Sequence, residues 1–390
     1  MDMKNHNAGV TTGEHPDKSV ADRPSSAVRG GTLLLTGGTG ALGRVLIREV
    51  LQESEARILA VVRRSRGTDP QERLRLILRD EGVSGEIGGR VGVIGGNLGV
   101  GDFGLLAEQL DGLRREVDSF LHLAALTDLT ASREDLFRVN VEGTRRALKL
   151  AWDLHRRGRL SRFGYFSTAF VAGSRQDWRA PEDEVCPHPA WANAYEESKF
   201  VAESLVREAI AGGLPAMIFR PSIVVGDSQT GRTGAFNVVY PFFRLVASGL
   251  LPAVPGRPTD VMQIVPIDFV ARAAWAIFRR HDSAGRTYHL TSSNPPNLEL
   301  ILRLKEALEP GAPPLRLISP ERLEAEPLTP HIRRAIEIVK PHLGYVIHNL
   351  SFETSNTERA LRGSGIEMPD TGYDFMHRII SYAKTAGFFN

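Results

Sequence analysis

The sequence predicts an α/β fold in which helices cover both faces of a doubly wound parallel sheet. From Thr32 to about residue 225, short apolar runs alternate with stretches of helical periodicity. The apolar runs are nearly continuous, which is typical of strands that are buried on both faces of a parallel sheet. A glycine-rich turn follows the first run, at the point where a strand would pass into a helix. Together these three observations define the fold class.

Each predicted element follows from its own stretch of sequence. The apolar runs predict strands over 32–38, 57–64, 90–97, 119–126, 162–168 and 215–222, and the periodic stretches between them predict helices over 41–52, 70–81, 132–157 and 191–212.

The chain changes character after about residue 225, where loops rich in glycine and proline surround an apolar helix candidate over 235–251. This helix could line a substrate channel or form part of a core, and both interpretations remain open. Three parts are therefore expected. They are a disordered tail (1–28), a Rossmann-like nucleotide-binding domain (29–225) with a returning element at about 262–292, and a smaller, mostly helical C-terminal substrate domain (226–261 and 293–390).

Composition excludes several classes of protein. The 390 residues carry a formal net charge of +2, whereas a dedicated nucleic-acid binder is strongly basic. Cys186 is the single cysteine, so neither an intrachain disulfide nor a cysteine-built metal site can form, and no metal site is expected. No apolar run approaches the ~18 residues of a transmembrane helix, and the polar N-terminus lacks the apolar region of a signal peptide. A cytoplasmic location is therefore expected.

The turn "TGGTGALG" places Gly37, Gly40 and Gly43 between the first strand and the first helix. Glycines there let the backbone approach a pyrophosphate, and the helix N-terminus supplies N–H donors and a positive dipole end. The pattern predicts a dinucleotide site formed by Thr36, Gly37, Gly40, Ala41, Leu42 and Gly43.

The end of the second strand distinguishes the two nicotinamide cofactors. "AVVRRSR" offers Arg63, Arg64 and Arg66, with no carboxylate that could hold a ribose 2′-hydroxyl. Guanidinium groups pair with a 2′-phosphate, so NADPH is predicted. The alternative is a solvated basic loop.

A hydroxyl pair ends the fifth strand, and a tyrosine and a lysine lie one helical turn apart further on. Ser167 and Thr168 fall at the carboxyl edge of the sheet, where open α/β folds bind ligands, and "AYEESKF" contains Tyr195 and Lys199. With TGGTGALG, HLAALTD, RVNVEGT and RPSIVVGDS, this constellation resembles the extended short-chain dehydrogenase/reductase superfamily over about 31–300. The closest likeness is to the fatty acyl-CoA reductase and carrier-protein thioester reductase branch.

The resemblance assigns roles to four catalytic candidates. Tyr195 would give or take the proton, Lys199 would bind the nicotinamide ribose, and Thr168, rather than Ser167, would hold the substrate oxygen. An ammonium one turn away should also lower the pKa of the phenol towards the working range. Asn140 would support the helix of the proton relay, although an asparagine at a helix start is equally well a plain N-cap.

The resemblance also implies further contacts with the cofactor. Pro221 could contact the cofactor or could simply end its strand. His122 is better explained as a core histidine than as a catalytic one. The additional cofactor candidates are Asn97, Leu98, Ala124, Ala125, Thr127, Pro221 and Ile223, besides Tyr195 and Lys199.

The reaction implied is NADPH-dependent reduction of an acyl thioester to an aldehyde, with an alcohol as a further product. The thioester would arrive in trans on coenzyme A or on an acyl-carrier protein, which the basic cluster over 154–162 could dock. A peripheral membrane contact through 331–343 is the less favoured interpretation of an amphipathic helix. The alternatives are a dehydrogenase or epimerase of a sugar nucleotide or sterol, and a non-catalytic NADP-binding regulator.

Overall fold

The computed structural model describes residues 30–64, 67–83, 89–175, 178–184, 190–236, 238–248, 253–308, 315–319, 330, 334, 344–345 and 350–389. The predictions for the tail (1–28), for Arg66 and for Cys186 lie outside the described residues, as does almost all of 331–343.

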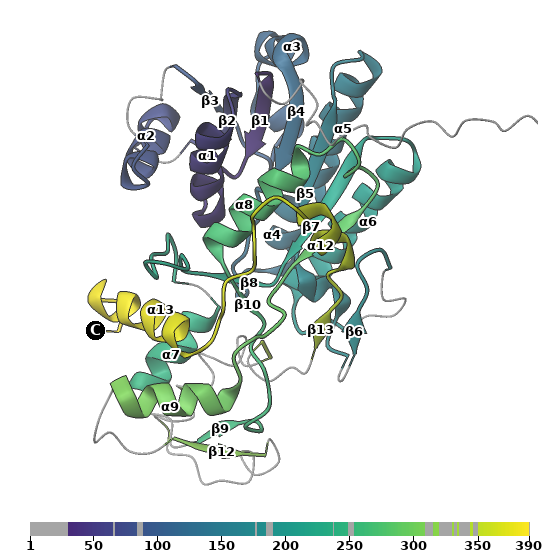
Figure 1. The fold of residues 1–390 in the computed structure, drawn as a ribbon. Coiled ribbons are helices and arrows are strands. Elements are labelled where there is room, and N and C mark those ends of the chain that lie inside the picture. The colour runs from purple at the N-terminus through teal and green to yellow at the C-terminus, as the bar shows by residue number, and fades with distance from the viewer. Residues whose placement is uncertain are drawn as a thin grey trace, which may run out of the picture.

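A seven-stranded parallel sheet organises the fold (Figure 1). Its strand order is β11-β7-β5-β4-β1-β2-β3, so the direction of winding reverses between β1 and β4. This reversal is the switch point beside which doubly wound folds bind ligands, and the predicted fold class is confirmed. The strands are β1 (Thr32–Thr36), β2 (Arg57–Val62), β3 (Val91–Gly95), β4 (Val117–His122), β5 (Arg162–Phe166), β7 (Ala216–Pro221) and β11 (Thr287–Leu290).

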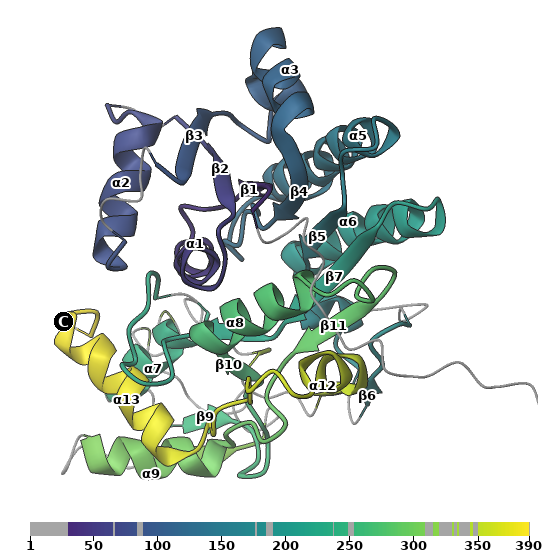
Figure 2. The same ribbon diagram turned by 45° about the horizontal axis from the view of Figure 1, so that its top comes forward.

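Helices cover both faces of this sheet (Figure 2). One apolar cluster joins the sheet to α1 (Ala41–Glu53), α2 (Pro70–Asp80), α8 (Ile267–Phe278) and α12 (Ser355–Leu361). The other cluster joins it to α3 (Ala107–Glu116), α5 (Glu142–Arg156) and α6 (Ala194–Ala211). Local sequence explains where two of these helices begin. The Asp69 side chain accepts hydrogen bonds from the first turn of α2, and Asn193 accepts one from Glu196 N at the start of α6.

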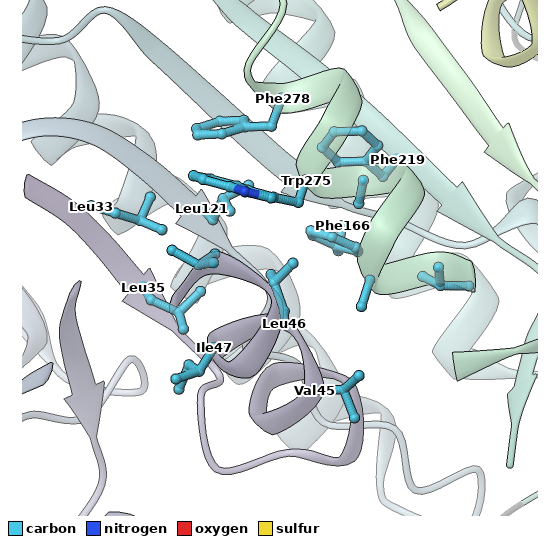
Figure 3. Packing of buried hydrophobic residues seen from close by; sticks show 14 of the residues in the cluster. Leu33, Leu35, Val45, Leu46, Ile47, Leu121, Phe166, Phe219, Trp275 and Phe278 are labelled. Atoms are coloured by element: carbon cyan, nitrogen blue, oxygen red, sulfur yellow. The ribbon is translucent and has the colours of Figure 1, made fainter. Parts of the chain in front are cut away.

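The returning segment completes the core (Figure 3). Trp275 and Phe278 of α8 pack among side chains of α1 and the sheet, including Leu46 and Phe219, and each is no more than 1% exposed. Strand β11 then extends the sheet beside β7. The packing of α8 against α1 and the pairing of β11 with β7 explain the apolar stretches of this segment.

A second layer lies beyond the carboxyl edge of the sheet. It contains the helices α7 (Val239–Ala247), α9 (Leu298–Leu308) and α13 (Tyr373–Thr385), which share one apolar cluster. Three strand pairs join distant segments: β8 (Ile223–Val225) with β10 (Ile264–Pro266), β9 (Ala253–Pro255) with β12 (Arg316–Ile318), and β6 (Arg179–Ala180) with β13 (Ser351–Phe352). Among the described residues, no helix is long and apolar enough to cross a membrane.

Two of the differences from the predicted elements concern helices before residue 160. Helix α3 was not predicted, because only Leu110 and Leu113 of its ten residues are buried and its apolar periodicity is weak. The single helix predicted over 132–157 consists of α4 (Arg133–Leu136), a π-helical segment η3 (Phe137–Val141) and α5. The widened turn of η3 contains Asn140, which is discussed below.

Candidate active site

The glycine turn after β1 is closed by tight backbone packing. A Cβ atom on Gly43 would lie 2.1 Å from the carbonyl oxygen of Gly37, so only glycine fits there. Gly37 adopts a φ of +83°, and a Cβ on it would meet Ala124 N at 2.7 Å. Gly40 begins α1 without a side-chain cap. No side chain caps the first turn of this 13-residue helix, so its backbone N–H groups can bind a ligand. Such donors suit the pyrophosphate of a dinucleotide.

The ends of β1 and β4 are joined by buried polar contacts. Thr36 Oγ1 lies 2.7 Å from Nδ1 of His122 and accepts a hydrogen bond from Ala124 N. The other ring nitrogen of His122 lies 3.2 Å from Thr144 Oγ1. Burial, together with the Lys199 charge, lowers the pKa of His122 to about 3, so the ring stays neutral. These contacts agree with the interpretation of His122 as a core histidine.

The basic end of β2 lies at the surface beside β3. Arg63 and Arg64 are both exposed, and Arg64 Nε lies within 3.3 Å of where a Cβ on Gly95 would be. The Arg63 carbonyl accepts a hydrogen bond from Arg73 of α2. The Arg64 guanidinium thus lies next to the end of β3, and both arginines remain accessible.

Lys199 reaches from α6 to the end of β5. Its Nζ donates a 2.6 Å hydrogen bond to the carbonyl oxygen of Phe166 and lies 4.4 Å from the centre of the Tyr165 ring. The lysine is 2% exposed, and this burial lowers its pKa to about 7 against the opposing effect of the Glu203 carboxylate. Lys199 is therefore held at the carboxyl edge of the sheet, next to Ser167 and Thr168.

The expected lowering of the Tyr195 pKa is wrong. Burial raises the pKa of this phenol above its usual value, and the Glu196 carboxylate raises it further. The physical reason is that desolvation penalises a phenolate, whereas the Lys199 ammonium is directed at the Phe166 carbonyl and the Tyr165 ring. The Tyr195 phenol is thus neutral near neutral pH, and the residue is only partly exposed.

The two hydroxyls after β5 face different neighbours. Thr168 Oγ1 donates a long hydrogen bond of 3.5 Å to the carbonyl of Pro221 and accepts one from Phe170 N. Ser167 instead lies beside Glu203 and helps to lower the pKa of that carboxyl. Pro221 is the last residue of β7, so it ends its strand and also faces Thr168.

Asn140 connects the β4 edge to the helix that carries Tyr195 and Lys199. Its Nδ2 donates to the Leu126 carbonyl at 3.0 Å and to Ser198 Oγ at 2.9 Å, while its Oδ1 accepts from Leu126 N. The side chain is 1% exposed and caps no helix, since the N-cap position of α5 is Val141. The N-cap interpretation of Asn140 is therefore wrong, and the asparagine braces α6.

The other cofactor candidates lie around the same edge. Asn97 is exposed, and its side-chain oxygen accepts a hydrogen bond from Gly99 N. Leu98 packs near Gly143, and its carbonyl accepts a hydrogen bond from Arg146. Ala125 and Thr127 follow β4, and Ile223 begins β8.

Three residues near the first turn of α6 were missed by the sequence analysis. Asn193 Nδ2 donates a 2.8 Å hydrogen bond to the hydroxyl of Tyr345, which also bonds the Glu196 carboxyl. The Tyr345 ring stacks edge-on against Phe170 at 4.7 Å. Burial raises the pKa of Glu196 to about 7. An acidic residue of "YEES" in contact with a distant tyrosine leaves no local signal in the sequence.

The chain is similar to known proteins in sequence and in fold. Residues 35–274 match the family described as "Male sterility protein". A nonribosomal peptide synthetase of Aspergillus flavus is 30% identical over 68% of the chain, and a carboxylic acid reductase of Segniliparus rugosus is 31% identical over 64%. The crystal structure of the terminal R domain from the myxalamid PKS-NRPS pathway superposes with a TM-score of 0.80 at 26% identity, and the match covers 95% of this chain and 94% of that domain.

The two curated relatives are much longer proteins, of which the chain spans 26% and 23%. The similarity to the R domain, in contrast, extends over nearly all of both chains. With the glycine turn at the switch point and the Tyr195–Lys199 helix beside it, the chain belongs to the male sterility protein family of nicotinamide-dependent reductases, within the extended short-chain dehydrogenase/reductase superfamily.

Proposed function

We propose that the protein reduces acyl thioesters to aldehydes with NADPH. The observation that carries the proposal is the position of Lys199, whose ammonium binds the carboxyl end of β5 beside Thr168 and one helical turn from Tyr195. The residues proposed to hold the cofactor are Thr36, Gly37, Gly40, Ala41, Leu42, Gly43, Arg63, Arg64, Asn97, Leu98, Ala124, Ala125, Thr127, Tyr195, Lys199, Pro221 and Ile223.

The cofactor, when bound, supplies a hydride to the thioester carbonyl carbon. Thr168 and Tyr195 then hold the resulting substrate oxygen, and Tyr195 provides its proton. The carbon–sulfur bond breaks as the carbonyl re-forms, and the proton of the hydroxyl passes to the departing thiolate. One thioester, one hydride and one proton thus yield one aldehyde and one thiol. Because the Tyr195 phenol is already protonated, it can donate this proton without first taking one up from solvent.

The two arginines after β2 support NADPH over NADH. Both are accessible and can pair with a 2′-phosphate. We expect Arg64→Ala to weaken NADPH binding by about tenfold or more and to leave NADH binding unchanged. Fluorescence titration with both nucleotides measures this. Arg57→Ala, at the opposite end of the same strand, is the control.

The carrier of the thioester is tested in the same enzyme assay. Oxidation of NADPH is followed with a long-chain acyl-CoA and with the same acyl group on a phosphopantetheinylated carrier protein, and the products are identified. Tyr195→Phe should lower turnover by about 10²–10³. Tyr382→Phe, which keeps its ring contact with Phe236, should not. Full turnover in Tyr195→Phe would refute the proposed chemistry, and an alcohol product would extend it.

A further inference from the structure

A second ionisable side chain lies one helical turn beyond Lys199. Glu203 follows it by four residues on α6, so the two side chains share one face of the helix. Each is only 2% exposed. A buried carboxylate is costly unless it is paired, and the reduction described above does not use it.

Glu203 is fixed in place by two arginines. Arg220 of β7 donates from Nε at 3.0 Å and from Nη2 at 2.6 Å, and Arg207 donates from Nε at 2.9 Å. Arg220 is itself held by the carbonyls of Pro181 and Glu182 and lies 3.2 Å from Nε2 of His289. The two guanidinium groups outweigh burial and lower the pKa of Glu203 to about 2, so it stays charged across the working pH range.

Among the described residues, the groups other than Glu203 that interact with Lys199 carry no charge near neutral pH. They are the Tyr165 ring and the Phe166 carbonyl on β5 and the neutral His122 on β4. The protonated Tyr195 lies one turn earlier on the same helix. Burial alone therefore favours the neutral amine of Lys199, and the Glu203 carboxylate opposes it.

We propose that Glu203 is a positioning residue, a fixed buried counter-charge that holds Lys199 in its ammonium form at the carboxyl end of β5. An ammonium keeps all three donors for the Phe166 carbonyl and for a bound nucleotide, whereas a neutral amine loses one donor and its positive charge. The inference rests on the proposed function only for the role of Lys199 in binding the nucleotide during the reduction.

The test measures the titration of Lys199 directly, without substrate or cofactor. The chain has seven lysines, so protein labelled with ¹³C at the lysine ε-carbons gives a simple NMR spectrum, and Lys199→Met assigns the signal. In the unmodified protein this signal should titrate well below the other six. Glu203→Gln should lower its midpoint by about one pH unit. An unchanged midpoint in Glu203→Gln would overturn the inference.

Two further variants separate charge from structure. Glu208→Gln makes the same chemical change at an exposed position of the same helix and should leave the midpoint in place. Arg207→Gln removes one donor to Glu203 but keeps the carboxylate, so the midpoint should stay or rise, whereas a general loosening would lower it in both Arg207→Gln and Glu203→Gln. If Glu203→Gln does not fold, Glu203→Asp keeps a charge for Arg220 but withdraws it from Lys199, and a smaller decrease is expected.

Enzyme assays then distinguish this inference from the proposed function. The alkaline limb of the pH profile of kcat/KM should move to lower pH in Glu203→Gln by the same amount as the NMR midpoint. Full turnover in Lys199→Met would contradict the role given to Lys199 in catalysis, yet would leave the measured titration intact. An NMR midpoint that moves with no change in the pH profile would overturn the positioning role.

Discussion

The first and third turns of α6 each bury a glutamate, and the two respond to burial in opposite ways. Glu196 and Glu203 are equally inaccessible, at 2% exposure each. Burial raises the pKa of Glu196 to about 7, because its partners are the neutral Tyr345 hydroxyl and the Ala192 backbone N–H. The pKa of Glu203 instead falls to about 2, because its partners are guanidinium groups.

The difference teaches that the charge of the partner decides the ionisation of a buried carboxyl on this helix. Neutral donors recover only part of the solvation lost on burial, whereas two arginines more than replace it. The first turn, next to Tyr195, therefore changes its protonation near neutral pH, while the third turn, next to Lys199, keeps a constant charge.

The largest expected effect comes from removing the main partner of Glu203. Arg220→Met leaves a buried carboxylate with Arg207 as its remaining guanidinium partner, which should cost about 3–5 kcal/mol in the free energy of unfolding. Urea denaturation at neutral pH measures this loss. A loss below about 1 kcal/mol would show that the pair is less desolvated than the structure indicates.

The next effect is a change in pH dependence. The folded protein holds the Glu196 proton up to a pKa of about 7, above the ordinary value of 4.5, so the folded state binds more protons between these two pH values. Stability should therefore fall as pH rises through this window, by up to about 1.4 kcal/mol per pH unit from this group.

Glu196→Gln should remove that contribution. Glu182, whose pKa burial also raises to about 7, acts equally in both proteins and cancels in the difference. When urea midpoints are measured from pH 4 to pH 8, the midpoint of Glu196→Gln should rise relative to that of the unmodified protein as pH increases. If the midpoints of the two proteins change in parallel between pH 4 and about pH 8, burial does not raise the pKa of Glu196, and the prediction is wrong.

A smaller effect is expected from Tyr345→Phe. The change keeps the ring contact with Phe170 but removes the hydroxyl bonded to Asn193 and Glu196, at a cost of about 0.5–1.5 kcal/mol. Because the hydroxyl lowers the pKa of Glu196, its loss should extend the pH window upwards. Denaturation curves at several pH values report both effects, and an unshifted window would place Tyr345 outside this interaction.

The smallest effect is expected at the other carboxylate of "YEES". Glu197 pairs with Arg133 through two hydrogen bonds, but the Arg133 side chain is 61% exposed. Solvent screens such a pair, so Glu197→Gln should leave the urea midpoint unchanged within error. A clear loss would mean that the ion pair between α4 and α6 contributes to the stability of α6.

Most of the sheet could be predicted from the sequence because its strands are buried on both faces and read as apolar runs. The glycine turn could also be predicted, because the close backbone packing at Gly43 leaves room for glycine alone. Helix α3 was not, because two buried leucines make a weak periodic signal.

The pKa values of the site residues could not be predicted from the sequence, because they depend on contacts between distant segments. The pKa of Tyr195 depends on burial beneath distant segments, and Tyr345 lies about 150 residues from the helix it contacts. The spacing of Tyr195 and Lys199 showed that both lie on one face, but not that the ammonium turns to the Phe166 carbonyl. Glu203 and Arg220 lie on different elements, so their pairing is visible only in the folded chain.

The return of 267–290 to the sheet determines how the molecule can be dissected. Trp275 and Phe278 fill the space between α1 and the strands, and β11 covers the edge of β7. A fragment that stops near residue 225 would expose this apolar surface and an unpaired strand edge, so it should be recovered as aggregate. Swapping the second layer between relatives therefore requires junctions on both sides of α8 and β11, with that segment left in its original chain.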